Sequence, residues 1–347
     1  MHMKVFSSIT AATAVPHLIR LDRNLYGLFF KIMKLVPAMF IIERAMERGE
    51  LRPGGHVAET SSGTFALGLG LACRERGIPF RIFTDPVIGR GLQSQLRLLG
   101  GEVVVAQRPA ANGGYQRARL DRLHEHLARN PLAYWPNQYG NPDHPRAYAP
   151  IADELLERIE SKLALVGSVG SGGSTCGMVA QLRKARPDTP LIAVDTFGSV
   201  IFGQRDRPRQ LRGLGNSILP ENVRHEFFDD VHWVSADVAF NATRALLRER
   251  AVFAGPTTGA AYLVARWYAE EHPERTVIFI GPDEGHRYLP TVYNDAWLTE
   301  QSFVPDAPLP IRPAIVDTPD CAHDKWSAYH WKRRSAHRVD EVANVSA

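Results

Sequence analysis

Short apolar runs recur along the chain, and most of them are followed by a segment with helical periodicity. The strand-like runs are HVAET (56–60), FRIFTD (80–85), EVVVA (102–106), LALVGSV (163–169), LIAVD (191–195), VHWVS (231–235) and VIFIGPD (277–283). Between them lie segments such as GMVAQLRKAR (177–186), whose apolar residues recur at helical spacing. Apolar strands that alternate with helices predict an α/β protein with mostly parallel sheets covered by helices.

The length of 347 residues predicts two domains, because it exceeds what a single hydrophobic core usually holds. A boundary is expected near residues 130–150, where NPLAYWPNQYGNPDHPRAYAP is rich in Pro, Asn and Tyr. From about residue 301, the Pro-rich sequence SFVPDAPLPIRPAIVDTPD (302–320) predicts an extended tail.

The composition is that of a globular protein, with 44% hydrophobic and 22% charged residues. A membrane span requires about 18 apolar residues. No apolar run of the sequence approaches that length, so no membrane partner is expected. The first residues loosely imitate a signal peptide, but Ser7, Ser8 and Thr10 interrupt the apolar stretch. We therefore expect no secretion.

The cysteines and the charges indicate the cellular compartment and the classes of partner that are expected. Three cysteines lie far apart (Cys73, Cys176 and Cys321), which favours neither a disulfide framework nor a metal site and suits a reduced cytoplasm. The net charge of +4 is spread along the chain. Its densest cluster, Lys332–Arg334, lies in the tail without an aromatic platform, so no nucleic-acid partner is expected.

Two lysines lie in the otherwise apolar stretch KIMKLVPAMFII (31–42). A lysine in such a stretch usually lays its methylenes on apolar surface and keeps its ammonium in water. A desolvated lysine instead has a lowered pKa and becomes a nucleophile. Pro37 predicts the first turn of a helix, which places Lys34 just before the helix N-terminus, where a charged ammonium is disfavoured.

A glycine-rich segment, GSVGSGGSTCG (167–177), follows a predicted strand and opens a predicted helix. Consecutive backbone N–H groups in that position bind anions such as phosphate. Gly170-x-Gly172 and Asp195 at the end of the next strand also permit a dinucleotide site and a nicotinamide-dependent dehydrogenase. However, Thr175 occupies the third glycine position, and the many hydroxyls fit a terminal phosphate monoester better.

These segments together resemble the cysteine synthase/cystathionine β-synthase family of fold type II pyridoxal-phosphate (PLP) enzymes. The segments GSGGSTCG, NQYGNPDHP, GLGNSILPENV, AGPTTGAA, GPDEGHRYL, HLIRL and ETSSGTFALGLGLA resemble family motifs and run in family order over residues 17–289. The resemblance implies PLP bound between two doubly wound domains, a homodimer, and a small amino-acid substrate. The implied larger, PLP-binding domain is 1–35 with 146–300, the smaller one is 36–145, and 301–347 is the tail.

The resemblance also assigns roles to residues of this chain. IMKLVPA (32–38) aligns with the family's lysine motif and makes Lys34 the residue that forms the imine with PLP, whereas Lys31 falls outside the site. Implied cofactor-binding residues are Thr64, Gly170, Ser171, Gly172, Gly173, Ser174 and Thr257. Implied substrate-binding residues are Ser61, Ser62, Gln138 and Gly213.

The chain departs from the family pattern at several of these positions. Thr64 stands where the family has asparagine, Phe65 replaces threonine, and Leu35 and Val36 replace Asp-Arg after the lysine. IADEL (151–155) occupies the place of a family threonine pair. These departures leave the substrate open and permit a non-catalytic, PLP-binding homologue.

The implied reaction is β-replacement on O-acetyl- or O-phosphoserine through an aminoacrylate intermediate, which gives cysteine or another β-substituted alanine. The segment VDTFGSVIFGQRDRPRQLRGLG (194–215) resembles, within the family, the enzymes that join O-phosphoserine to glutamate on the way to 2,3-diaminopropionate. The nucleophile is then an amine rather than a sulfide. The arginines of this segment, Arg205, Arg207, Arg209 and Arg212, offer charges for a phosphate or an acidic co-substrate, or form a solvated basic loop.

Overall fold

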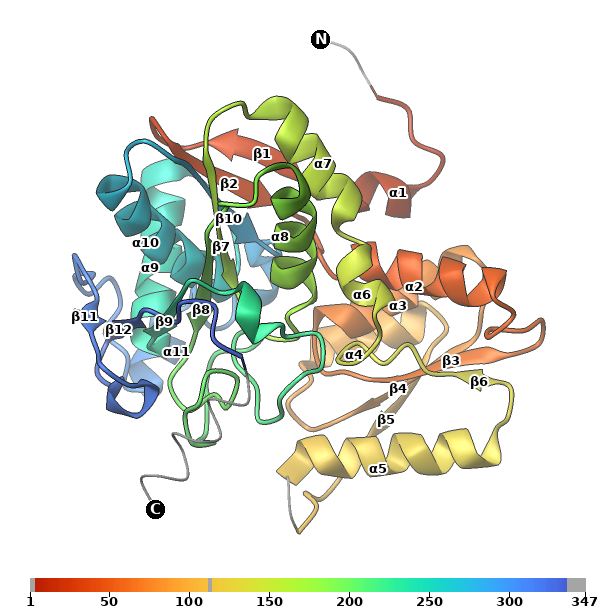
Figure 1. Ribbon diagram of the computed structural model, residues 1–347. Coiled ribbons are helices and arrows are strands. Elements are labelled where there is room, and N and C mark those ends of the chain that lie inside the picture. The colour runs from red at the N-terminus through yellow and green to blue at the C-terminus, as the bar shows by residue number, and fades with distance from the viewer. Residues whose placement is uncertain (1–3, 112–113, 336–347) are drawn as a thin grey trace. The chain divides into compact units, whose positions relative to one another are not determined.

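The computed structural model describes residues 4–111 and 114–335 (Figure 1). The chain divides into two compact units. Of the described residues, the first unit contains those up to Val15 together with Ile32–Ala147. The second contains Pro16–Lys31 and the chain from Tyr148 onward. The larger domain expected from the sequence, 1–35 with 146–300, differs from the second unit at its ends, since the part up to Val15, Ile32–Leu35 and residues 146–147 belong to the smaller unit.

The smaller unit is built on a four-stranded sheet in the order β5-β4-β3-β6. All three strand pairs are parallel, as predicted. The strands are β3 (His56–Thr60), β4 (Phe80–Thr84), β5 (Glu102–Val105) and β6 (Ala133–Tyr134). The helices are α1 (Ile9–Ala14), α2 (Leu35–Glu47), α3 (Thr64–Glu75), α4 (Arg90–Leu98), α5 (Gly114–Arg129) and α6 (Asp143–Arg146).

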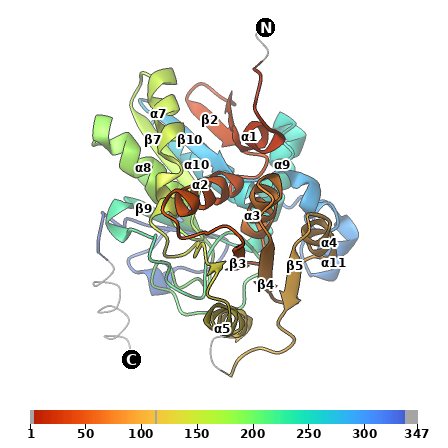
Figure 2. The same cartoon turned by 90° about the vertical axis from the view of Figure 1, so that its right-hand side faces the viewer.

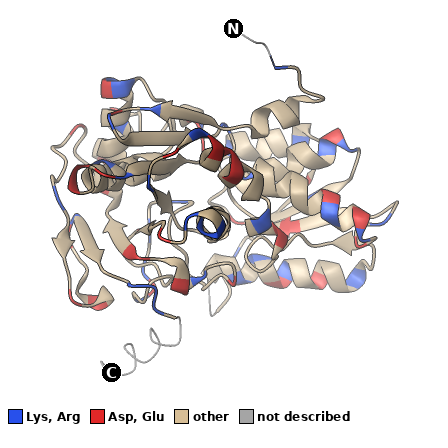
Figure 3. Ribbon diagram, turned by 45° about the horizontal axis from the view of Figure 1, so that its top comes forward, with Lys and Arg blue, Asp and Glu red and all other residues tan. Residues whose placement is uncertain are grey.

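Helices cover both faces of this sheet. α5 lies on one face, and α2 and α3 lie on the other (Figures 1 and 2). The core under α2 and α3 contains Leu35, Ile41 and Phe65, all 2% exposed or less. On the outer face of α5, basic and acidic residues alternate (Figure 3), including the pairs Arg117–Asp121 and Arg129–Glu125. This helix therefore presents no single-sign surface to a polyanion.

The larger unit contains an eight-stranded sheet in the order β1-β2-β10-β7-β8-β9-β12-β11. Its strands are β1 (His17–Arg20), β2 (Leu25–Phe29), β7 (Leu163–Ser168), β8 (Leu191–Asp195), β9 (Asp230–Val234), β10 (Thr276–Gly281), β11 (Ala314–Ile315) and β12 (Trp326–Tyr329). The strands are parallel except for the pairs β1–β2 and β9–β12, which are antiparallel. This topology confirms the predicted α/β class.

Helices α7 (Ala149–Arg158) and α8 (Gly173–Ala185) pack on one face of the larger sheet. Helices α9 (Ala236–Arg250) and α10 (Pro256–Glu271) pack together on the other face (Figure 1). Short helical turns complete the unit: η1 (His225–Phe227), η2 (Gly285–Tyr288), α11 (Asp295–Glu300) and η3 (Pro319–Cys321). No helix within residues 4–111 and 114–335 is long and apolar enough to cross a lipid bilayer.

The segment after residue 300 is more than the extended tail that its prolines predict. β12 pairs with β9 and so extends the larger sheet, and Trp326 and Trp331 are 3% and 2% exposed. Gln204 donates hydrogen bonds to the carbonyl oxygens of Pro319 and Ala322 at 3.2 Å. The aromatic residues after the prolines supply the buried area that anchors this segment.

Candidate functional site

Lys34 directly precedes the first residue of α2, as the position of Pro37 predicts. Its backbone is helical, with φ −69° and ψ −9°. Burial of its ammonium group lowers the pKa of Lys34 from 10.5 to about 8. Lys31 is exposed. Of the two lysines in this stretch, Lys34 therefore has the environment of a nucleophilic amine.

The backbone of Lys34 packs directly against helix α3 at Gly68. A Cβ atom added at Gly68 would lie 2.8 Å from the carbonyl oxygen of Lys34 and 3.0 Å from Cα of Leu35. Because real Cβ atoms do not approach other atoms so closely, only glycine allows α3 to lie there. The sequence pattern does not distinguish Gly68, which stands among the apolar residues of a helix.

The loop Ser61–Gly63 leads from strand β3 into α3, whose first residue is Thr64. Ser61 is 5% exposed, and its hydroxyl accepts a hydrogen bond from the backbone N–H of Gly63 at 3.3 Å. The N-terminus of this 12-residue helix directs backbone N–H groups into the loop. The loop therefore offers donors and a positive dipole end to an anion.

A buried arginine that the sequence did not reveal stands beside this loop. Arg119 on α5 donates from Nη1 to the hydroxyl of Ser62 at 3.1 Å and to the carboxylate of Asp85 at 2.8 Å. The Arg119 and Asp85 side chains are 8% and 9% exposed. Nε of Arg119 has no hydrogen-bond partner among the described residues. A partly satisfied guanidinium thus lies next to a residue predicted to bind the substrate.

Gln138 is held beside the same loop. Its side-chain amide donates to the carbonyl oxygen of Thr60 at 3.2 Å, and its backbone N–H donates to Glu59 at 3.2 Å. Nδ1 of His144 lies 2.6 Å from the carbonyl oxygen of Gln138. Burial, and then the charge of Lys34, lower the pKa of His144 to about 3, so the ring is neutral near pH 7.

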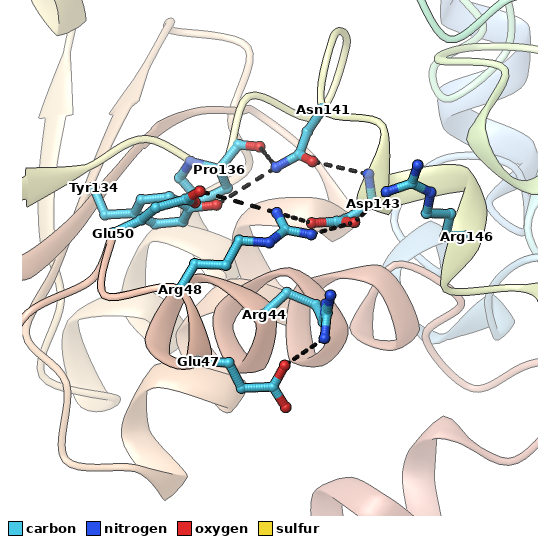
Figure 4. Close-up of polar contacts among 9 residues, drawn as sticks. All are labelled: Arg44, Glu47, Arg48, Glu50, Tyr134, Pro136, Asn141, Asp143 and Arg146. Carbon is cyan, nitrogen blue, oxygen red and sulfur yellow. Dashed lines mark hydrogen bonds and ion pairs between the residues drawn. The ribbon is translucent and has the colours of Figure 1, made fainter.

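Arg48, at the C-terminal end of α2, binds the segment that carries Gln138 and His144 (Figure 4). Arg48 makes two hydrogen bonds to the buried carboxylate of Asp143, at 2.7 and 3.1 Å. Asn141 donates to the carbonyl oxygen of Pro136 at 2.8 Å and accepts from the backbone N–H of Asp143 at 2.9 Å. α2 therefore contributes Lys34 at one end and fixes this segment at the other.

In the larger unit, the glycine-rich loop connects β7 to α8 as predicted. Gly172 has φ +79°, and a Cβ atom there would lie 2.7 Å from the carbonyl oxygen of Asn222. A Cβ atom at Gly170 would lie 3.1 Å from the carbonyl oxygen of Gly213. The loop is therefore a tight backbone turn in front of a 13-residue helix, which is the arrangement that binds phosphate.

The structure brings the predicted residues of the larger unit together. Gly213 has φ +74°, and a Cβ atom there would lie 3.5 Å from Cγ2 of Thr257. Asn216 donates from Nδ2 to the carbonyl oxygen of Gly170 at 3.3 Å. Ser171 and Ser174 are buried in the same loop, at 5% and 6% exposure. Asn216, which connects the two loops, was missed in the sequence because its partner lies 46 residues away.

Thr257 is 3% exposed at the start of α10, and Oγ1 has no hydrogen-bond partner among the described residues. A buried hydroxyl without a hydrogen-bond partner lowers stability unless a bound ligand supplies that partner. Together, the glycine turn and this hydroxyl fit a cofactor with a terminal phosphate and a polar ring atom.

The sequence profile of the family described as pyridoxal-phosphate dependent enzyme matches residues 18–283, which is more than half of the chain. The chain belongs to this family of PLP-dependent enzymes. Its cofactor is PLP. Family membership decides against the dinucleotide interpretation of the glycine-rich loop.

Two curated relatives show the similarity in sequence. Both are named N-(2-amino-2-carboxyethyl)-L-glutamate synthase. The chain is 36% identical to that of Ralstonia nicotianae over 265 residues, which cover 76% of this chain and 78% of the relative. It is 34% identical to that of Cupriavidus metallidurans over 268 residues, which cover 76% and 79%.

Solved structures show the similarity in fold. O-acetyl serine sulfhydrylase isoform 3 of Entamoeba histolytica superposes with a TM-score of 0.77 at 23% identity, over 84% of this chain and 92% of that one. The O-acetylserine-dependent cystathionine β-synthase of Helicobacter pylori superposes with a TM-score of 0.76 at 22% identity, over 84% and 100%. The protein therefore has the predicted fold of the fold type II PLP enzymes.

Proposed function

We propose that the protein catalyses β-replacement on an O-activated L-serine, with the amine of L-glutamate as the nucleophile. The C–O bond at Cβ of the serine breaks, the phosphate or acetate group leaves, and a C–N bond forms to glutamate. The observation that carries the proposal is Lys34, a half-buried lysine whose desolvated amine has a pKa near 8, in a chain 36% identical to a relative named for this product. Cysteine formation with sulfide is the second candidate, since the fold neighbours include sulfhydrylases.

Lys34 is proposed as the residue that holds the cofactor and later moves the α-proton of the substrate. When bound, PLP withdraws electrons from Cα of the amino acid, which allows loss of that proton and of the β-leaving group. A pKa near 8 leaves a sizeable fraction of Lys34 neutral at pH 7 to 8, so the amine can act as a general base.

The glycine-rich loop of the larger unit is proposed to bind the cofactor phosphate. Gly170, Gly172 and Gly173 supply backbone N–H groups, and Ser171 and Ser174 supply hydroxyls. The hydroxyl of Thr257, which has no hydrogen-bond partner among the described residues, is proposed to form a hydrogen bond with the ring nitrogen. A neutral hydroxyl leaves that nitrogen less protonated than a carboxylate would, which favours elimination over long-lived carbanion chemistry.

The loop Ser61–Thr64 and Gln138 are proposed to bind the substrate carboxylate, and Gly213 is proposed to lie near the substrate amine. Support comes from the α3 N-terminus, the hydroxyls of Ser61 and Ser62, and the contact of Gln138 with Thr60. Arg119, whose charge is offset by Asp85 at 2.8 Å, adds a buried guanidinium donor beside Ser62. Its Nε, which has no hydrogen-bond partner among the described residues, suits an anionic group of the substrate.

The arginines between residues 205 and 212 differ in what they can recognise. Arg209 is engaged with the carboxylate of Asp206 at 2.7 Å and with the carbonyl oxygen of Gly198, so it stabilises its own loop. Arg205 and Arg207 are exposed. We propose these two, rather than Arg209, as the residues of this loop that attract an acidic co-substrate.

Two further proposals concern the protein in the cell. The family resemblance supports a homodimer. The three free cysteines, of which Cys73 and Cys176 are buried, support a reducing cytoplasm.

Incubation of the purified PLP-loaded protein with O-phosphoserine or O-acetylserine, with and without L-glutamate, tests the proposal. The expected product has the mass of glutamate joined to a 2-amino-2-carboxyethyl group, and it forms only when both substrates are present. Formation of cysteine when sulfide replaces glutamate, without any glutamate product, would support the second candidate. A PLP-loaded protein that turns over neither serine derivative with either nucleophile would contradict β-replacement and support a non-catalytic homologue.

A further inference from the structure

Glu59 is a fully buried acidic residue that the proposed mechanism does not use. It lies on β3, two residues before the loop that begins at Ser61, and is 1% exposed. A buried carboxylate lowers stability unless donors surround it. The stability of the fold around Glu59 therefore depends on the donors that surround its carboxylate.

Three N–H groups from two separate segments converge on this carboxylate. Oε1 accepts from the backbone N–H of Thr60 at 2.6 Å and from the indole N–H of Trp135 at 3.1 Å. Oε2 accepts from the backbone N–H of Gln138 at 3.2 Å. Glu59 thus connects the end of β3 to a segment more than 70 residues later in the chain.

The chemistry of these partners requires a carboxylate. An amide has a single acceptor oxygen, so a glutamine here would present an N–H₂ group to at least one N–H donor. Burial raises the pKa of Glu59 to about 7, whereas its hydrogen bonds and the charge of Arg119 lower it. The chain therefore retains an acidic group at a site where burial disfavours its charge.

Gln138 is consequently fixed on three sides. Glu59 accepts from its backbone N–H, its side chain donates to the carbonyl oxygen of Thr60, and Nδ1 of His144 contacts its carbonyl oxygen. Removal of the first contact would free the peptide that orients the Gln138 amide. Small displacements of a substrate-positioning group are costly in rate or affinity.

We propose that Glu59 is a positioning residue that holds Gln138 and the Ser61–Thr64 loop in the geometry that receives the substrate carboxylate. This proposal rests on the proposed function, in which those residues bind that carboxylate. Glu59 is expected to act on substrate affinity and not on capture of the cofactor by Lys34.

Steady-state kinetics of Glu59→Gln tests this role. Loss of a hydrogen bond to a charged group should raise KM for the O-activated serine about tenfold, with PLP content and kcat changed by less than about twofold. Trp135→Phe removes a single donor and should raise KM by a smaller factor. Glu102→Gln, which alters an exposed glutamate on β5 of the same sheet, is the matched control and should leave KM unchanged.

Hydrogen exchange supplies a readout that does not depend on turnover. The amide of Gln138 should exchange about tenfold faster or more in Glu59→Gln than in the wild type, and at the wild-type rate in Glu102→Gln. Unchanged KM and unchanged exchange would overturn the proposal. A fall in PLP content with KM unchanged would also overturn it, because Glu59 would then serve the fold alone. If the wild type turns over no serine derivative, the proposed function fails, and the exchange rates still decide whether Glu59 holds Gln138.

Discussion

Gly68 lies against the carbonyl oxygen of Lys34, and a Cβ atom added at Gly68 would approach that oxygen to 2.8 Å. The contact joins the N-terminus of α2 to the middle of α3 inside the smaller unit. Lys34 therefore depends for its position on a residue with no functional group.

Gly68→Ala should destabilise the protein and disturb Lys34. Overpacking of a tight contact costs about 1 to 3 kcal/mol of unfolding free energy. Thermal unfolding and the rate of PLP uptake measure the two effects. The control is Gly91→Ala on α4, where an added Cβ atom meets none of the described atoms within 4 Å. Alanine should be neutral or stabilising there. Equal unfolding temperatures and equal rates of PLP uptake in the two variants would show that the contact with Lys34 tolerates an added Cβ atom.

The pKa of Lys34 predicts a pH dependence. Covalent capture of the PLP aldehyde requires the neutral amine, so its rate in the PLP-free protein should rise with pH and level off above about 8. The folded pKa lies below the ordinary 10.5, so the folded state binds fewer protons than the unfolded state between about 8 and 10.5. The Lys34 contribution to stability therefore increases as pH rises through that window.

Replacement of the ammonium tests the same desolvation. Lys34→Met should abolish activity yet raise the unfolding free energy of the PLP-free protein at pH 7 by about 1 to 3 kcal/mol. Lys31→Met, in the exposed neighbour, is the control and should change neither quantity appreciably. A stability loss in Lys34→Met would show that the interactions of the ammonium outweigh the cost of its desolvation.

Arg119→Met should weaken binding of the serine substrate. Removal of a charged donor beside Ser62 should raise KM about tenfold, and more for O-phosphoserine than for O-acetylserine, because the former carries more negative charge. The matched control is Arg117→Met, two residues earlier on α5, where the side chain is 65% exposed and pairs with Asp121. Equal KM values in the two variants would exclude a role for Arg119 in substrate binding.

Gly172→Ala should lower the affinity for PLP. Alanine at φ +79° is strained, and its Cβ atom would also meet the carbonyl oxygen of Asn222 at 2.7 Å. Gly49→Ala has a similar φ of +70° with nothing within 4 Å, so it isolates the strain, about 1 kcal/mol. Titration of each PLP-free variant with PLP provides the comparison. A Gly172→Ala protein with wild-type affinity would place the phosphate elsewhere.

Local sequence patterns were sufficient for much of the fold and part of the site. The run LALVGSV followed by a glycine-rich turn predicted β7 and the start of α8, because strand burial and turn chemistry are local properties. Pro37 placed Lys34 at a helix start for the same reason.

The features that the sequence does not predict depend on contacts between residues far apart in the chain. Strand β12 lies in a Pro-rich context and forms by pairing with β9, whose paired residues lie 92 to 98 positions earlier. Arg119 reaches Ser62 across 57 residues, and its helical neighbours Arg117 and Arg122 carry the same charge in an ordinary solvated pattern. In the sequence, Glu59 is a polar residue within a short strand. Its contacts with Trp135 and Gln138 form only in the folded chain.

Borohydride reduction of the PLP-loaded protein, followed by peptide mass mapping, identifies the lysine that holds the cofactor. Reduction fixes the cofactor permanently to the lysine that holds it. We expect the PLP adduct on Lys34 alone, and no adduct in Lys34→Met. An adduct on Lys31 or on any other lysine, with Lys34 unmodified, would contradict the assignment of Lys34 as the residue that holds the cofactor.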